Sequence, residues 1–191
     1  MAKNEPKDKR IKEIIEAAID VFLEKGYEGA TIDSIAKKAG VSKGGFYHYF
    51  PDKEVLLLEA NSKLSEPLIK MAETAMASHS AINGLLDYIR SYLLYWKERP
   101  RELGFFYLSM AKSLESEPLM AYYKTYMVEV TEFYTYMIKR ANDEGDLSTK
   151  DQALMGVLLM GAIDGIMNYL VVFPDSDIDS MVSLIESIWL D

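Results

Sequence analysis

The outward residues of a short predicted helix, over residues 42–50, have the chemistry of a DNA-contacting surface. With their apolar neighbours turned inward, Lys43, Gly44, Tyr47 and His48 remain on the exposed side. Hydrogen-bond donors and short side chains at the start of a helix suit phosphates and base edges in a DNA major groove. The spacing therefore predicts a helix that contacts duplex DNA.

Residues suited to catalysis or metal binding form no recognisable set. The 191 residues include two histidines and no cysteine, and they contain no phosphate-binding loop, dinucleotide fingerprint or HExxH motif. Acids at positions 143, 144 and 146 surround Gly145 without the order of a calcium loop, so we interpret them as a solvated helix end. We expect neither enzyme activity nor a cofactor or metal.

Two short helices and a tight turn are predicted to hold the contact residues. Thr31 can cap a first helix that runs through Ala39, Gly40 can adopt the positive φ of the turn, and Ser42 can cap the second helix. Ala36 must be small where the helices cross. The apolar residues expected to fill the shared core are Val41, Phe46 and Phe50.

The segment TIDSIAKKAGVSKGGFYHYFPDKEVLL, preceded by AAIDVFLEKGYEGA, resembles the DNA-binding head of the TetR family of transcriptional regulators. The resemblance covers about residues 10–60. It implies a helix-turn-helix head, an effector cavity in a helical body and a homodimer. The phosphate contacts that it implies are Thr31, Tyr47 and Lys53, and the contacts to phosphates or base edges are Ser42, Lys43 and His48.

Position 45 departs from the family pattern, in which it carries a side chain within reach of DNA. Here it is Gly45, next to Gly44, and each glycine weakens a helix by about 1 kcal/mol relative to alanine. We therefore expect sequence reading to rely on Lys43, Tyr47, His48 and DNA shape. The basic arm over residues 1–12 is a candidate for minor-groove contacts.

Charge is distributed unevenly along the chain. The net charge is -9, but residues 1–60 carry ten basic and eleven acidic residues, so most of the acidic excess lies further on. A protein of this charge does not bind nucleic acid through bulk positive charge. DNA binding must therefore be local to the head.

Periodicity of 3.6 residues predicts an all-α fold of about nine helices, with no alternating pattern typical of strands. We expect a DNA-binding domain over residues 1–52 and an effector-binding and dimerisation domain over residues 53–191. The predicted spans are 8–25, 31–39, 42–50, 53–76 with a kink at Pro67, 81–98 ended by Pro100, 101–114, 118–142, 150–172 and 178–190.

The middle helices are rich in tyrosine and methionine. Buried tyrosine hydroxyls need hydrogen-bond partners, and tyrosine with methionine suits a pocket for flat apolar ligands, although such a stripe can equally be plain core. The family resemblance favours an effector pocket. Its candidate residues are Tyr88, Tyr92, Trp96, Phe106, Met110, Tyr122, Tyr126, Phe133, Met160, Asp164 and Asn168.

Asp164 and Asn168 lie four residues apart on one face of an otherwise apolar helix. A carboxylate there must be paired, hydrogen-bonded or protonated. Two roles stay open, a structural contact between helices and an effector contact that favours a cation or a hydrogen-bond donor.

The last two helices, over residues 150–172 and 178–190, are predicted to form the homodimer interface that the family resemblance implies. The first is apolar around most of its circumference, and Gly161 and Gly165 permit close helix approach. A membrane span is disfavoured because Asp164 lies within it and no positive flank anchors it. No signal peptide opens the chain, so we expect a cytoplasmic protein.

The function expected is a ligand-responsive regulator, most simply a repressor that binds a palindromic operator as a homodimer and is released by a small lipophilic effector. The alternative is a helical ligand-binding or adaptor protein whose head no longer reads DNA. The glycine pair and the acidic charge motivate that alternative.

Overall fold

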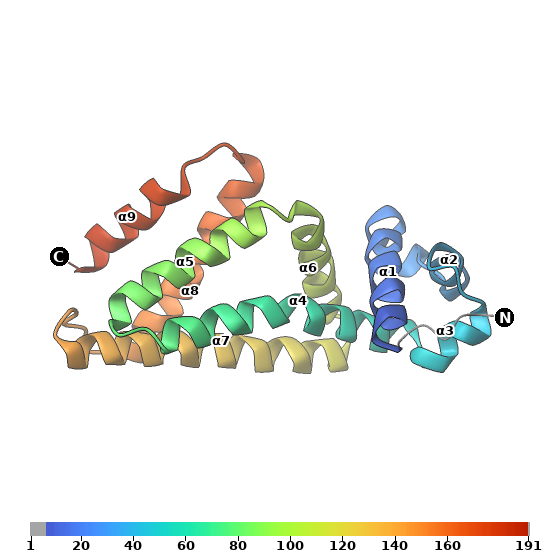
Figure 1. The fold of residues 1–191 in the computed structure, drawn as a ribbon, viewed down its shortest axis with the longest axis horizontal. Helices are drawn as coiled ribbons and strands as arrows, with labels where there is room; N and C mark the ends of the chain where they lie inside the picture. The colour runs from blue at the N-terminus through green and yellow to red at the C-terminus, as the bar shows by residue number, and fades with distance from the viewer. Residues whose placement is uncertain (1–6, 191) are drawn as a thin grey trace. The chain divides into compact units, whose positions relative to one another are not determined.

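The chain folds into helices joined by short turns. The structure, a computed structural model, describes residues 7–190, side chains at 189 and 190 excepted, and within this range it contains nine helices and no strand (Figure 1). The predicted all-α fold is confirmed. The helices are α1 Lys7–Gly29, α2 Ile32–Lys38, α3 Lys43–Tyr49, α4 Lys53–Met76, α5 Ala81–Lys97, α6 Pro100–Ser113, α7 Glu117–Glu144, α8 Gln152–Val172 and α9 Ile178–Leu190.

Contacts divide the chain into two units. The head unit comprises Met1–Ser65 and Arg101–Tyr123, and the body unit comprises Glu66–Pro100 and Lys124–Asp191. Both α4 and α7 contribute to the two units. These two units are defined by contacts, and they do not coincide with the predicted domains, which divide the chain at residue 52 by function. The functional division stays a prediction.

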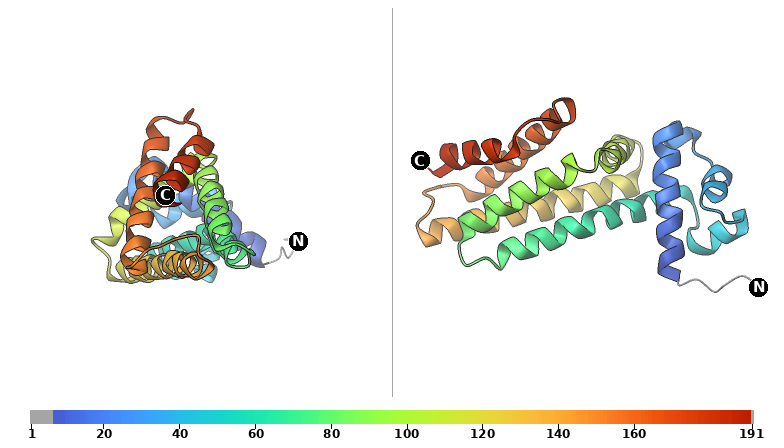
Figure 2. Two further views of the ribbon diagram at one scale, coloured as in Figure 1. Left: turned by 90° about the vertical axis from the view of Figure 1, so that its left-hand side faces the viewer. Right: turned by 45° about the horizontal axis from the view of Figure 1, so that its top comes forward.

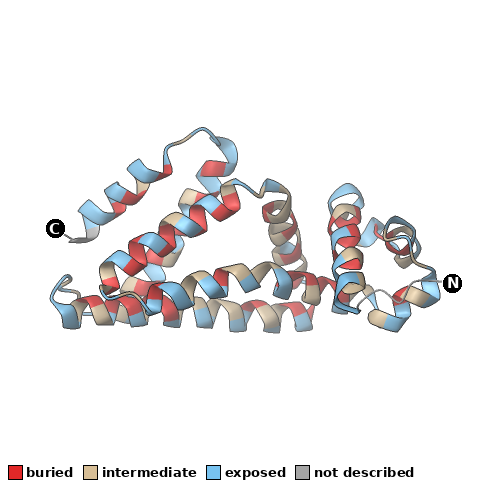
Figure 3. Cartoon of the chain, in the orientation of Figure 1, coloured by how far each residue is buried: buried red, intermediate tan, exposed pale blue. Residues whose placement is uncertain are grey.

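The core of the head unit is built on one face of α1. Ile14, Ile15, Ala18, Ile19 and Phe22 follow helical spacing, and all are buried (Figure 3). Further apolar side chains from later helices complete the same cluster. They include Ile35, Ala36, Phe46, Phe50, Leu56, Leu57, Ala60, Phe105 and Leu119.

A kink at Gly26 lies near the C-terminal end of α1, and Lys53 contacts the residues that follow it. Gly26 has a positive φ of 69° and interrupts the helical geometry at the position where the sequence predicted the helix to end, but α1 continues beyond this kink to Gly29. The Lys53 Nζ donates to the carbonyl oxygens of Tyr27 at 2.6 Å and Ala30 at 3.2 Å, and it lies 4.1 Å from the Tyr27 ring centroid. The first residue of α4 therefore caps the end of α1.

The body unit is organised around α5. Figure 2 shows α5 and α8 inclined to α7, and α9 returns over α5. One face of α5 is buried, whereas α8 exposes much of its apolar surface. By length and composition α8 could cross a membrane, but the core helix of a soluble protein passes the same test.

The helix before Pro100 ends there as predicted, since α5 stops at Lys97 with Glu98 as its C-cap. Pro100 itself is the first residue of α6, one position before the predicted start of that helix. Proline suits this position because its missing N–H would have no helical partner there. Pro67 lies inside α4, which continues on both sides of it.

Candidate nucleic-acid interface and effector site

Hydroxyl caps fix the two short helices of the head. The Thr31 Oγ1 accepts from the Ser34 backbone N–H at 3.1 Å, and the Ser34 Oγ accepts from the Thr31 N–H at 3.1 Å. Gly40 follows α2 with a φ of 67°, and the Ser42 Oγ then accepts from the Gly45 N–H at 3.0 Å. Local hydrogen bonds thus define both helices and the turn, as the sequence predicted.

The second short helix, α3, has sharply different faces. Phe46 is fully buried, whereas Tyr47 is 48% exposed. Ser42, Lys43, Gly44 and His48 are also exposed. The structure therefore brings five of the predicted DNA contacts together on α3 and immediately before it.

Lys43 has a nearby acidic partner. Its Nζ lies 3.1 Å from the Asp33 Oδ1 on α2, and both side chains are more than half exposed. An exposed ion pair of this kind contributes about 0–1 kcal/mol, so Lys43 can exchange Asp33 for a phosphate at little cost.

Thr31 and Lys53 have structural roles in the described arrangement. The Thr31 hydroxyl caps α2, and the Lys53 ammonium caps α1 as described above. A hydroxyl oxygen keeps a donor for a phosphate while it accepts, and an ammonium has three donors. Their predicted phosphate contacts stay predictions.

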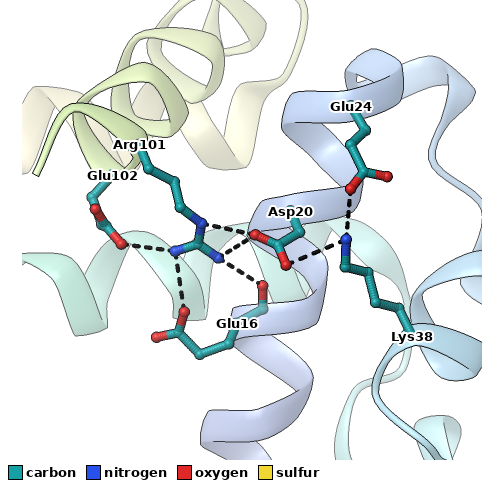
Figure 4. Close-up of polar contacts among 6 residues, drawn as sticks. All are labelled: Glu16, Asp20, Glu24, Lys38, Arg101 and Glu102. Atoms are coloured by element: carbon teal, nitrogen blue, oxygen red, sulfur yellow. Dashed lines mark hydrogen bonds and ion pairs between the residues drawn. The ribbon is translucent and has the colours of Figure 1, made fainter.

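An ion-pair network, which the sequence did not reveal, connects α6 to α1 and α1 to α2 (Figure 4). The Arg101 guanidinium lies 2.6 Å from the Asp20 carboxylate and 3.1 Å from that of Glu16. Lys38 approaches the other Asp20 oxygen at 3.3 Å. Burial alone would raise the pKa of Asp20, but hydrogen bonds and charge from Arg101 and Lys38 lower it below its ordinary value.

A second polar network in the head unit is buried. The Asn61 Nδ2 donates to the Ser109 Oγ at 2.6 Å and to the Leu57 carbonyl at 2.8 Å, and the Tyr123 hydroxyl donates to the Asn61 Oδ1 at 3.1 Å. It links α4, α6 and α7. Asn61 follows Leu57 by four positions and Ala60 by one, so it shares their buried face of α4, and this was the available sequence signal. Its partners Ser109 and Tyr123 are far away in sequence.

In the body unit, the effector candidates include an aromatic cluster. Tyr88 lies with its ring centroid 5.9 Å from that of Tyr92 and 4.5 Å from that of Phe133. Tyr92 in turn contacts Trp96 at 6.3 Å. Tyr134, absent from the candidates, joins the cluster at 5.9 Å from Tyr88.

The other body candidates differ in exposure. Tyr126, Met160 and Asp164 are half-buried, whereas Asn168 is exposed. The Asn168 Nδ2 donates to the backbone carbonyl of Asp164 at 2.9 Å, so the two side chains do not form one hydrogen-bonded pair.

Three effector candidates belong to the head unit. Phe106 packs edge-on to Tyr123 at 5.7 Å, and the Tyr122 hydroxyl lies 3.0 Å from the Ser65 Oγ. Met110 is half-buried. Across residues 7–190, no group of three or more histidine and acidic side chains is placed to hold a metal ion.

Comparison with known proteins bears on the head and the whole chain. The family model for bacterial regulatory proteins of the tetR family matches residues 14–60. The HTH-type transcriptional regulator YuxN of Bacillus subtilis is 53% identical over 47 residues, which are 25% of this chain and 16% of YuxN. The HTH-type transcriptional repressor AcnR of Corynebacterium efficiens is 31% identical over 141 residues, which are 72% of this chain and 69% of AcnR.

Solved structures share the fold over nearly the full length. A Clostridium perfringens protein described as a fatty acid metabolism regulator has a TM-score of 0.79 at 25% identity, covering 94% of this chain and 97% of that one. FadR of Bacillus subtilis, solved with stearoyl-CoA, has a TM-score of 0.75 at 21% identity, covering 94% and 97%. The relatives are regulators, not enzymes, which confirms the prediction that this chain is not an enzyme. Taken with the capped helix-turn-helix, the match to AcnR shows that the chain belongs to the TetR family of transcriptional regulators.

Proposed function

We propose that the chain is a repressor that binds a palindromic operator as a homodimer and is released by a small lipophilic effector. Residues 1–52 would contact DNA, and residues 53–191 would bind the effector and the second copy. The observation that carries the proposal is the donor-rich exposed face of α3 behind which Phe46 is completely buried. The relative AcnR is a transcriptional repressor, which supports repression.

The proposed DNA contacts divide by chemistry. Lys43 and His48 are candidates for base edges or phosphates, and Tyr47, Thr31 and Lys53 are candidates for phosphates. Ser42 and Gly44 let the start of α3 approach the DNA closely, because neither presents a long side chain.

Exposed apolar surface supports dimerisation through α8 and α9. Leu158 on α8 is 56% exposed and Leu184 on α9 is 59% exposed. Between the apolar residues of α8, a side chain added at Gly161 or Gly165 would meet no atom within 4 Å. A second copy that covers these helices would bury this surface, and two heads would read the two halves of a palindrome.

Release follows from linkage between the two sites. An effector that binds the DNA-free arrangement more tightly than the DNA-bound one lowers operator affinity by the same factor. The aromatic cluster of the body unit, centred on Tyr88, is the proposed apolar part of the effector site.

Selection of bound duplexes from a random oligonucleotide pool tests the proposal. Purified protein should enrich an inverted repeat, and sedimentation should show a dimer. Lys43→Ala should weaken binding to the selected duplex and reduce its salt dependence by about one counterion. Lys124→Ala, which removes an equal charge from an exposed position of α7, should change neither.

Two results would contradict the proposal. A folded dimer that enriches no sequence would favour the ligand-binding or adaptor protein with a degenerate head. Equal losses for Lys43→Ala and Lys124→Ala would show that the start of α3 does not contact the operator.

A further inference from the structure

The end of α1 and the start of α4 enclose the ammonium group of Lys53. Its Nζ donates to the backbone carbonyls of Tyr27 at 2.6 Å and Ala30 at 3.2 Å, and it lies 4.1 Å from the centroid of the Tyr27 ring. Two carbonyl oxygens and one aromatic ring thus surround a half-buried cation. We call Tyr27, Ala30 and Lys53 together the Lys53 site.

The turn that follows the kink at Gly26 supplies the two carbonyl oxygens. The last carbonyl groups of a helix have no backbone partner, so those of Tyr27 and Ala30 can accept from a side chain. The Ala30 N–H donates back to the Gly26 carbonyl at 3.1 Å. The Tyr27 ring stacks on the fully buried Phe22, with centroids 5.5 Å apart and planes 17° from parallel. Contacts other than those of Lys53 therefore fix Tyr27 in place.

Lys53 differs from a neighbouring lysine in having no acidic partner. Lys112 of α6 lies 4.9 Å from the centroid of the same Tyr27 ring, and its Nζ pairs with Glu28 at 2.5 Å and Glu115 at 2.8 Å. Among the described residues, no carboxylate lies within ion-pair distance of the Lys53 Nζ. A half-buried positive charge that is held only by carbonyls and a ring favours an anion from outside the chain.

The Lys53 site adjoins Thr31, another of the proposed phosphate contacts. Thr31 directly follows Ala30, and its exposed hydroxyl caps α2. The ammonium uses two of its three protons on the carbonyls, so one donor remains, and the Thr31 hydroxyl keeps its own proton while it accepts. A cation and a hydroxyl donor 22 positions apart in sequence thus lie close together, an arrangement that suits a phosphate.

We propose that Tyr27 is a positioning residue for DNA binding, whose ring and carbonyl hold the Lys53 ammonium beside Thr31 so that both residues bind one phosphate of the duplex. This inference rests on the proposed function and adds a residue that does not itself contact DNA. A lysine held in place before binding loses less conformational entropy when it meets a phosphate. The expected gain in affinity is about three- to tenfold.

A double-mutant cycle on duplex binding tests the positioning role. Fluorescence anisotropy at several salt concentrations measures the affinity for the selected operator and for a scrambled duplex, because a phosphate contact acts on both. Lys53→Met should weaken both complexes and reduce their salt dependence by about one counterion. Tyr27→Leu should weaken binding by about three- to tenfold in the wild type and change little in the Lys53→Met protein.

Two further variants separate the ring from general effects. Tyr27→Phe keeps the ring and should recover the affinity that Tyr27→Leu loses. Tyr136→Leu, at a tyrosine that is 46% exposed on α7 in the body unit, should leave duplex binding unchanged.

The wild-type protein gives a second test, which decides if Tyr27→Leu fails to fold. In proton NMR spectra, the ε-methylene signal of Lys53, assigned by its loss in Lys53→Met, should be shifted upfield by the Tyr27 ring and should stay shifted when duplex is added. The inference is overturned if this shift disappears on binding, if Lys53→Met binds as tightly as the wild type, or if Tyr27→Leu loses the same factor in both backgrounds. Failure to select an operator would contradict the repressor proposal alone, because binding of the scrambled duplex at low salt still measures the phosphate contact.

Discussion

At the scale of single residues, the two adjacent glycines of α3 have different surroundings. A Cβ atom added at Gly44 would meet only the Ser42 Oγ, at 3.9 Å. The same atom added at Gly45 would lie 3.2 Å from that oxygen, which already caps the helix. The second glycine therefore has a packing reason that its departure from the family pattern did not reveal.

We predict that Gly44→Ala increases the free energy of unfolding by about 0.5–1 kcal/mol, because alanine favours helix more than glycine. Gly45→Ala should gain less, because its methyl group crowds the capping hydroxyl. Urea unfolding of both variants measures the difference. Equal gains would show that Ser42 shifts without loss of its cap.

The stability that Arg101 gives to the fold depends on pH. Its guanidinium and Lys38 lower the pKa of Asp20 below 3.8, so the fold gains stability from this carboxylate above that pH and loses it as pH falls through the lower, folded value. We predict that Arg101→Gln lowers the free energy of unfolding by about 1 kcal/mol at neutral pH, allowing for partial exposure of the pair.

The difference between wild type and Arg101→Gln should shrink in acid. Urea unfolding at neutral pH and at about pH 3 gives the two values. Lys124→Gln, which removes an exposed charge, should show a smaller effect at neutral pH. A difference that stays constant from neutral to acid would mean that Arg101 acts through packing alone.

At the scale of elements, α8 approaches α7 through Gly156. A Cβ atom there would lie 2.9 Å from the Thr135 Oγ1 and 3.2 Å from the Thr135 backbone nitrogen. The close approach leaves no room for a methyl group without moving the α7 backbone.

We predict that Gly156→Ala lowers the free energy of unfolding by about 1–3 kcal/mol, although alanine is the better helix former. The matched control is Gly104→Ala on α6, where the added Cβ atom would lie at an ordinary 3.5 Å from the Leu23 Cδ2 and should stabilise the protein. Thermal or urea unfolding compares them. Stabilisation by both substitutions would contradict the tight packing of α7 and α8.

Elements were predictable from the sequence where their signals are local. Thr31 and Ser42 cap helices by hydrogen bonds to residues three positions away, and the turn at Gly40 depends only on the positive φ of that residue. The network of Arg101 joins residues 81 positions apart, and the Asn61 bond to Ser109 spans 48 positions. Helical periodicity shows that these residues lie on helices but does not show which distant side chain each will meet.

At the scale of the whole molecule, the exposed apolar faces of α8 and α9 determine assembly in the proposed homodimer. We predict that Leu158→Lys or Leu184→Lys converts the dimer to a monomer, because each would bury an unpaired ammonium in the interface. Sedimentation velocity measures the mass. The control is Leu114→Lys, at a position in the head unit that is 79% exposed, and this variant should remain a dimer.

A dimer that survives both α8 and α9 substitutions would place the interface elsewhere. Operator binding should fall together with dimerisation, since one head alone contacts half of a palindrome.

The core of the head determines whether the DNA-binding residues 1–52 can be separated from the rest of the chain. Leu56, Leu57 and Ala60 from α4, with Phe105 from α6, are fully buried in the cluster that contains Phe46. A fragment cut at residue 52 would lack these side chains and would leave the opposing apolar faces open to water. The DNA reader is therefore not an autonomous cassette: grafted alone onto another protein, residues 1–52 would lose part of the core that holds α3 in place.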